Sequence, residues 1–135
     1  LRWVTVASPA YLARFGTPQT VEELHDHSCL TVRNLRSGRM VDWQFMLDGK
    51  VRDVSVEGRL IFDIGDALVD GAVGGFGIAQ VMDFAVRDDL AAGRLVPILE
   101  SFAGRSRAIS LVYPPSRQYS PKLIAFAEAL AQAQW

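Results

Sequence analysis

Four glycines lie among the seven residues from Gly71 to Gly77, and the elements on either side of them constrain the fold. The preceding segment has apolar residues on one helical face, namely Ile64, Ala67, Leu68 and Ala72. The following segment, GIAQVM at residues 77–82, is short and apolar like a buried strand. A dinucleotide-binding fingerprint has the opposite order, and a P-loop needs a lysine followed by serine or threonine. The glycines therefore predict a helix-to-strand joint and not a phosphate cradle.

Strand and helix patterns alternate along the rest of the chain. Strand patterns occupy residues 2–8, 29–33, 41–47, 50–62, 94–99 and 107–114. Helix patterns occupy residues 9–15, 20–24, 83–93 and 121–134. This alternation predicts an α/β fold with a mixed sheet flanked by helices.

Several short signals place the ends of these elements. Ser8 is a predicted N-cap with Pro9 in the first helical position, and Gly16 ends that helix. Thr20 and Glu23 have the spacing of a capping box.

Two further segments have expected positions in the fold. The Asp48-Gly49 pair predicts a hairpin, which we expect at an edge of the sheet with Gly58 as a bulge. Pro97 suits an edge strand. The last helix should bury a stripe formed by Leu123, Ile124, Ala127 and Leu130.

Composition excludes several functional classes. Fourteen basic and fifteen acidic residues, mixed along 135 positions, give a net charge of −1 and no basic stripe for nucleic acid. No apolar run is long enough to span a membrane, and no signal peptide is recognisable. The single cysteine, Cys29, rules out an internal disulfide and fits a reducing cytoplasm. The chain opens in a strand pattern without a methionine, so we expect a piece of a longer protein.

Metal and catalytic chemistry are not expected. His25, His27 and Cys29 are suitable zinc ligands, but they lie between a helix and a strand and would point in different directions. No Gly-X-Ser-X-Gly motif is present, and Cys29 should pack as a small buried residue. We therefore expect no metal, no cofactor and no enzymatic activity.

Five segments in series carry a family resemblance: ASPAYLARFGTP, HSCL, DALVDGAVGGFGIAQVMDF, LAAGRLVPIL and YSPKLIAFAEAL. Together, from Val4 to Leu130, they resemble the effector-binding domain of LysR-type transcriptional regulators. The resemblance implies a fold like that of type 2 periplasmic binding proteins. Residues 9–106 would form the second regulatory subdomain. Residues 1–8 and 107–135 would supply crossover strands and the C-terminal helix of the first.

The resemblance also implies partners. A small-molecule effector, such as an organic acid, would bind between the subdomains and change their relative angle. DNA would be bound only through an N-terminal domain outside this chain, and the regulator would be a homo-oligomer. A solute-binding protein of a transport system shares the two-lobed fold and is the alternative. An enzyme using the same cleft would need catalytic residues that we do not find.

The resemblance places candidate ligand contacts at the cleft. The loop Asp63-Ile64-Gly65-Asp66 begins a helix, whose N–H groups could hold an anion. Asp63 could equally be a plain N-cap.

Five other residues complete the predicted site. Ser8 and Pro9 fall at the first hinge crossing, although Ser8 is also an N-cap. Arg33 could pair with an effector carboxylate or be an ordinary exposed arginine. Met82 and Asp83 would line the cleft, Met82 standing where the family usually has proline, and Asp83 could also be an N-cap.

Overall fold

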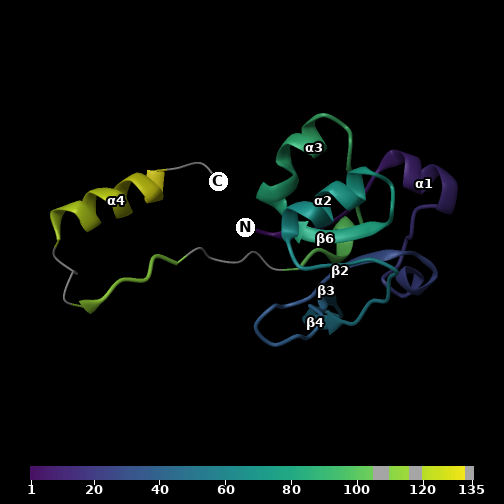
Figure 1. The fold of residues 1–135 in the computed structure, drawn as a ribbon, viewed down its shortest axis with the longest axis horizontal. Helices are drawn as coiled ribbons and strands as arrows, with labels where there is room; N and C mark the ends of the chain where they lie inside the picture. Colours follow the sequence, from purple (N-terminus) through teal and green to yellow (C-terminus); the bar gives the residue numbers. More distant parts are fainter. Residues whose placement is uncertain (105–109, 116–119, 133–135) are drawn as a thin grey trace. The chain divides into compact units, whose positions relative to one another are not determined.

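The computed structural model describes residues 1–104, 110–115 and 120–132. The chain divides into two compact units, residues 2–106 and Leu1 with residues 107–135 (Figure 1). Residues 2–8 belong to the larger unit. Which regulatory subdomain each unit represents stays a prediction.

The larger unit is built on a five-stranded mixed sheet, which confirms the predicted fold class. Its strands in spatial order are β5 (Ile61–Phe62), β2 (Cys29–Val32), β6 (Ile78–Met82), β1 (Trp3–Ala7) and β7 (Val96–Ile98). β2 is parallel to β5 and β6, while β1 runs antiparallel to β6 and β7. Pro97 lies in the edge strand β7, as predicted.

Side chains alternate between two cores on opposite faces of this sheet. One core joins Val6, Leu30 and Ala79 with Leu68 and other buried residues of helix α2 (Gly65–Val73). The other joins neighbouring strand residues with helix α1 (Pro9–Phe15) and with the hairpin of β3 (Trp43–Leu47) and β4 (Lys50–Val54). Figure 1 shows α2 on one side of β6 and the hairpin on the other.

The hairpin is a separate two-stranded sheet, so the expectation that it lies at the edge of the main sheet is wrong. Asp48 and Gly49 have φ of 51° and 71° and form the predicted two-residue turn. Trp43 and Phe45 are buried in the core, and this burial holds the hairpin against the face of the sheet.

The return strand is also shorter than expected, because β4 ends at Val54 and β5 is separate. Gly58 lies between these strands and is not a bulge within one. A Cβ atom on Gly58 would lie 1.5 Å from the backbone oxygen of Cys29. Gly58 therefore allows the loop to approach β2 closely.

The predicted caps are borne out at α1. Ser8 accepts a hydrogen bond from the Tyr11 N–H at 3.2 Å, and Gly16 follows the last residue of the helix. The capping box at Thr20 is wrong: the segment is a 3₁₀-helix, η1 (Glu22–Asp26), with Val21 at the N-cap. The Glu23 carboxylate instead accepts from the Gln19 N–H, one residue before Thr20.

The glycine segment is the predicted joint. α2 ends at Val73 with Gly74 as its C-cap, and Gly75 has φ of 79°. A Cβ on Gly77 would lie 2.3 Å from the Ser28 oxygen, so the chain enters β6 where a side chain would clash. Of the predicted helical face, Leu68 and Ala72 are buried, whereas Ile64 and Ala67 are exposed because they lie at the start of the helix.

The segment after β6 is divided into the 3₁₀-helix η2 (Asp83–Val86) and the short helix α3 (Arg87–Ala91). A further 3₁₀-helix, η3 (Glu100–Phe102), follows β7.

The smaller unit contains helix α4 (Pro121–Gln132). No residue of α4 is buried, so the predicted stripe is not a core here: Ile124 is exposed, and Leu123, Ala127 and Leu130 are half-buried. Residues 110–114 of the expected strand are not in a strand, and residues 107–109 lie outside the described part of the chain. In the described ranges, no helix is both long and apolar enough to cross a membrane.

Candidate functional site

The elements from which a ligand site can be built meet at one edge of the main sheet, the edge that is formed by strand ends and not by an edge strand. β2 and β6 are parallel, so their carboxyl ends, Val32 and Met82, lie at the same edge. β1 is antiparallel and begins there, with Trp3 opposite Met82. α2 begins at the same edge, with Gly65 and Asp66 in its first turn. Carboxyl ends of parallel strands are a common place for ligands in α/β folds.

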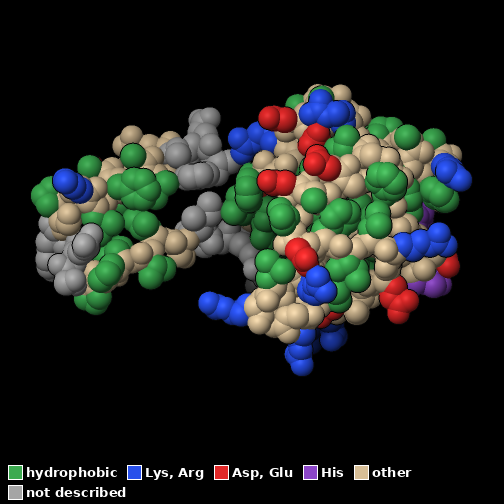
Figure 2. Space-filling view, viewed as in Figure 1, with side chains coloured by type: hydrophobic (Ala, Val, Ile, Leu, Met, Phe, Trp, Pro, Cys, Tyr) green, Lys and Arg blue, Asp and Glu red, His purple; other side chains and the backbone are tan. Residues whose placement is uncertain are grey.

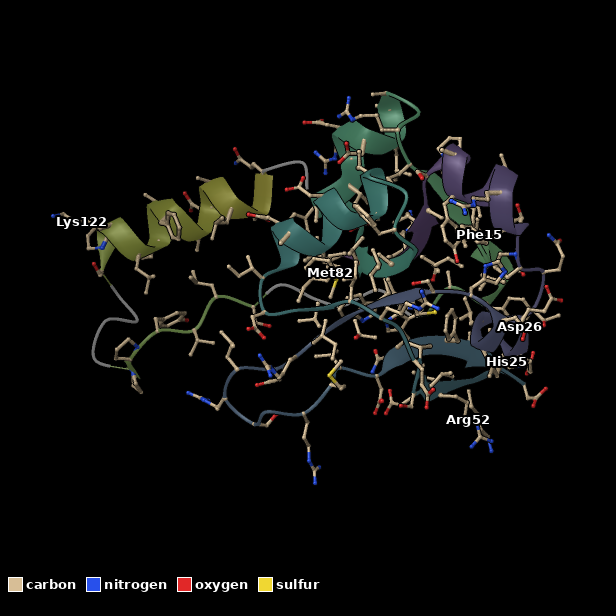
Figure 3. The ribbon with its side chains drawn as sticks, turned by 45° about the vertical axis from the view of Figure 1, so that its right-hand side comes forward. Phe15, His25, Asp26, Arg52, Met82 and Lys122 are labelled. Atoms are coloured by element: carbon tan, nitrogen blue, oxygen red, sulfur yellow. The ribbon has the colours of Figure 1, made fainter. Side chains whose placement is uncertain are left out.

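A pocket of about 320 Å³ opens at this edge. Its walls come from the sheet, α2, η2 and the segment that leads into the hairpin, and most of the lining side chains are apolar. Three of them are aromatic: Trp3, Trp43 and Phe84. Met82 lies at the level of the sheet beneath α2 (Figure 3). The polar side chains of the wall are Asp42, Asp66 and Gln80.

Gln80 ties the hairpin to the sheet beside this pocket. Its Oε1 accepts a hydrogen bond from the Gln44 N–H at 2.8 Å, and its Nε2 donates to the Gln44 carbonyl at 3.1 Å. Nε2 also lies 3.4 Å from the Thr5 hydroxyl oxygen. The side chain, 8% exposed, therefore acts like a peptide group of a neighbouring strand. It fixes the backbone of Gln44, the residue next to Trp43, and the Trp43 ring forms part of the pocket wall.

Arg33 and Asp63 form a two-pronged ion pair just after β2 and β5. Arg33 Nε and Nη2 donate to the two Asp63 oxygens, each at 3.0 Å. The bond from Arg33 holds the pKa of Asp63 below its ordinary value and raises the pKa of Arg33. The interpretation of Asp63 as the N-cap of α2 is wrong, because Ile64 occupies that position and the carboxylate is engaged by Arg33.

Asp83 forms its own local cluster. Its Oδ1 accepts hydrogen bonds from the Phe84 N–H at 3.0 Å and from the Arg2 N–H at 3.2 Å. Met82, and not Asp83, is the N-cap residue of η2. Asp83 thus links the start of β1 to the end of β6, one residue from the pocket wall.

The structure brings together three of the nine residues predicted for the site: Gly65, Asp66 and Met82 line the pocket. The residues next to them in sequence or space, Arg33, Asp63, Ile64 and Asp83, do not line it. Ser8 and Pro9 follow the carboxyl end of β1, at the opposite edge of the sheet.

Sequence reasoning missed Trp3, Trp43, Phe84 and Gln80. The one available signal was Gln80, a polar residue inside an otherwise apolar strand.

A larger hollow of about 820 Å³ lies at the other end of the sheet. Phe15 of α1 and Asp26 belong to its lining, and Figure 3 shows both far from Met82. Arg14, Glu57 and Arg59 line it as well, and all three are exposed. Because its rim is mixed in charge and largely open to solvent, the smaller pocket is the better candidate.

The three residues considered as zinc ligands have separate partners. His25 Nδ1 lies 2.6 Å from the Glu22 carbonyl, and His27 Nδ1 lies 3.2 Å from the Tyr11 hydroxyl. The Cys29 thiol faces the Leu24 carbonyl at 3.6 Å, and its burial raises its pKa to about 12. Within the described ranges, no three such side chains are grouped to hold a metal ion.

Comparisons with known proteins all point to one family. Residues 1–135 match the LysR substrate binding domain. A Pseudomonas aeruginosa protein named as a transcriptional regulator is 33% identical over 96% of this chain and 42% of its own length. The transcriptional regulator CrgA of Neisseria meningitidis is 32% identical over 97% of this chain and 43% of its own length.

Solved structures agree. The structure of CrgA, a LysR-type transcriptional regulator, matches with a TM-score of 0.79 and 29% identity over 96% of this chain and 43% of CrgA. The Vibrio cholerae virulence activator AphB matches with a TM-score of 0.67 and 28% identity over 77% of this chain and 35% of AphB. The chain spans less than half the length of the curated relatives it matches.

Proposed function

Because the chain belongs to the family of LysR substrate-binding domains, we propose that it senses a small molecule in the pocket at the carboxyl ends of β2 and β6. The observation that carries this proposal is the convergence of α2, the sheet and the hairpin segment on one largely apolar pocket with few polar groups. Such pockets bind small molecules through apolar contact and are made selective by a few polar side chains.

Gly65, Asp66 and Met82 are the predicted residues that we propose as contacts, and Trp3, Trp43 and Gln80 join them. Arg33 and Asp63 would act at the margin of the site as a pair and not as separate ligand contacts. We assign Ser8 a structural function as the cap of α1.

Exposed apolar side chains around the pocket support the proposal that another protein surface covers it. Val41 and Phe84, which line the pocket, are 36% and 54% exposed, and Ile64 beside it is 64% exposed. Figure 2 shows hydrophobic side chains gathered on the visible face of the larger unit. Contiguous exposed apolar surface commonly marks an interaction site. We propose that the first regulatory subdomain, most of it outside this chain, covers this surface and completes the site.

Ligand binding would then favour one arrangement of the two subdomains over another. In the whole protein this shift would reach DNA through a separate domain in a homo-oligomer of the cytoplasm. Both curated relatives described above are named transcriptional regulators, which favours this function over a solute-binding protein of transport. The same names favour a non-enzymatic function.

A pair of bulky substitutions on α2 tests the site. A Cβ at Gly65 meets no atom within 4 Å, so Gly65→Phe should fold and place its ring at the pocket. Ala67→Phe is the matched control, because Ala67 is exposed on the same helix and does not line the pocket. Compounds from a small-molecule library that raise the Tm of the chain should still do so in Ala67→Phe but not in Gly65→Phe. Equal responses in both variants would remove the pocket as the site.

A second measurement tests the regulatory step. The same compounds should change the affinity of the whole regulator for its operator DNA. If compounds bind in the pocket but leave DNA binding and subunit arrangement unchanged, the switching mechanism is wrong.

A further inference from the structure

The charge of the pocket wall narrows the class of ligand. Two carboxylates, Asp42 and Asp66, line the pocket, and among the described residues no lysine, arginine or histidine does. The arginine that could serve an acidic ligand, Arg33, lies outside the lining and is held in a two-pronged bond to Asp63. An anion in this pocket would therefore lie beside acidic side chains, and no basic side chain from the described part of the chain would balance them.

The N-terminus of α2 does not make the pocket favourable for an anion. The positive end of a helix dipole attracts an anion. In α2, however, Asp66 lies in the first turn, so the helix already carries a negative side chain at this end. An organic acid, the example of an effector that the resemblance implies, would bring a second carboxylate to the same place.

The aromatic side chains add a feature that favours positive charge. Trp3, Trp43 and Phe84 all contribute to the wall. The faces of aromatic rings attract cations, tryptophan most strongly, and they also stack on planar apolar groups. Carboxylates beside aromatic rings thus suit a ligand with an apolar or aromatic body and a protonated amine.

We infer that this wall selects an arylalkyl amine or a similar amphipathic cation over a carboxylic acid of the same size. The inference rests on the proposed function, because it assigns a ligand class to the proposed pocket. The aromatic body would pack against the tryptophans and the apolar ends of β2 and β6. The ammonium group would be directed toward the carboxylates of the wall, Asp42 and Asp66.

Three probes that share a 2-phenylethyl group test the inference: 2-phenylethylamine, 2-phenylethanol and 3-phenylpropanoate. Each is titrated into the ¹⁵N-labelled chain, and binding is followed through the amides of Gly65 and Asp66 and the indole N–H of Trp43. The amine should bind more tightly than the alcohol by about two- to fivefold for each carboxylate it meets. The carboxylate should bind more weakly than the alcohol.

Single substitutions assign the charge effect to its residues. Asp42→Asn and Asp66→Asn should each lower the affinity for the amine by about two- to fivefold and leave the affinity for the alcohol unchanged. Both positions are exposed, so neither variant should impair folding. Asp70→Asn is the control, because Asp70 is exposed on α2 outside the pocket and its loss should change none of the three affinities.

The outcomes separate the inference from the proposed function. If 3-phenylpropanoate binds in the pocket more tightly than the amine, the site stands and the ligand class is overturned. The ligand class is also overturned if the amine and the carboxylate bind with equal affinity and neither Asp→Asn variant changes either affinity. If none of the probes shifts the pocket resonances, the pocket and the ligand class both fail.

Discussion

The substitution Gln80→Met removes the link between the sheet and the β3–β4 hairpin while keeping the volume of the side chain. Methionine cannot reproduce the bonds to the Gln44 N–H and carbonyl, at 2.8 and 3.1 Å, or the weaker contact with Thr5. Because Gln80 is 8% exposed, water does not readily replace the lost partner.

The expected loss follows from the two short bonds. A hydrogen bond contributes about 1 kcal/mol net, and a buried polar group left without a partner costs about 1–3 kcal/mol. Two bonds lost at a partly buried site should lower the free energy of unfolding by about 2–4 kcal/mol. The effect should be concentrated in the hairpin, since Gln80 holds the backbone of β3.

Urea unfolding followed by tryptophan fluorescence measures the global loss, and native-state hydrogen exchange locates it. The Gln44 amide should exchange about 30-fold faster for a local loss of 2 kcal/mol. Gln44→Ala is the matched control, because it leaves the Gln44 backbone intact. It removes the exposed 3.0 Å bond from Gln44 Nε2 to Asp53, so about 0.5–1 kcal/mol should be lost.

Two results would refute this reasoning. One is a loss below about 0.5 kcal/mol for Gln80→Met, which is smaller than one ordinary hydrogen bond. The other is a larger loss for Gln44→Ala than for Gln80→Met, which would show that the Gln44 side chain, and not its backbone, holds the hairpin.

Three further predictions concern other parts of the larger unit. Gly58→Ala should destabilise the chain by about 1–3 kcal/mol in urea unfolding, because the new Cβ would lie 1.5 Å from a backbone oxygen. Gly65→Ala is its control and should be neutral or stabilising, since a Cβ there meets no atom within 4 Å. Cys29, with a pKa raised to about 12, should resist iodoacetamide at pH 8 until urea unfolds the chain, and equal rates before and after would contradict its burial. Arg33→Gln should return the lowered pKa of Asp63 toward its ordinary value in a ¹³C NMR titration. The ion pair should be fully formed above about pH 4 and be lost as the pH falls through the lowered pKa, so an unchanged titration would oppose this assignment.

Features that depend on a few neighbouring residues could be predicted from the sequence. The cap at Ser8, the Asp48-Gly49 turn and the glycine joint before β6 each follow from local backbone geometry. The placement of the hairpin could not be predicted in this way. Trp43 and Phe45 are buried on the face of the main sheet, and the alternating pattern alone does not distinguish a sheet edge from a sheet face.

The lining residues that were predicted depended on the family resemblance. Gly65, Asp66 and Met82 were proposed because the resemblance implies a cleft at strand ends and helix starts, and all three lie at such positions. The partner of Asp63 was not predicted, since Arg33 is 30 positions away and an aspartate before a helix is normally a cap. Trp3 reaches the pocket because β1 is antiparallel to β6, which the sequence does not specify.

The order of strands in the main sheet has a consequence for synthesis on the ribosome. β1 is made before the other strands of this sheet and, among the described residues, pairs with β6 and β7, so roughly 70 residues separate its completion from the start of its first partner. At ordinary translation rates of about 5–20 residues per second, β1 waits about 4–14 s with two open edges. During that interval Val4 and Val6 are exposed to other nascent chains and to chaperones. The step that closes the sheet is therefore a long-range one, and it should be slow compared with the formation of the local β3–β4 hairpin.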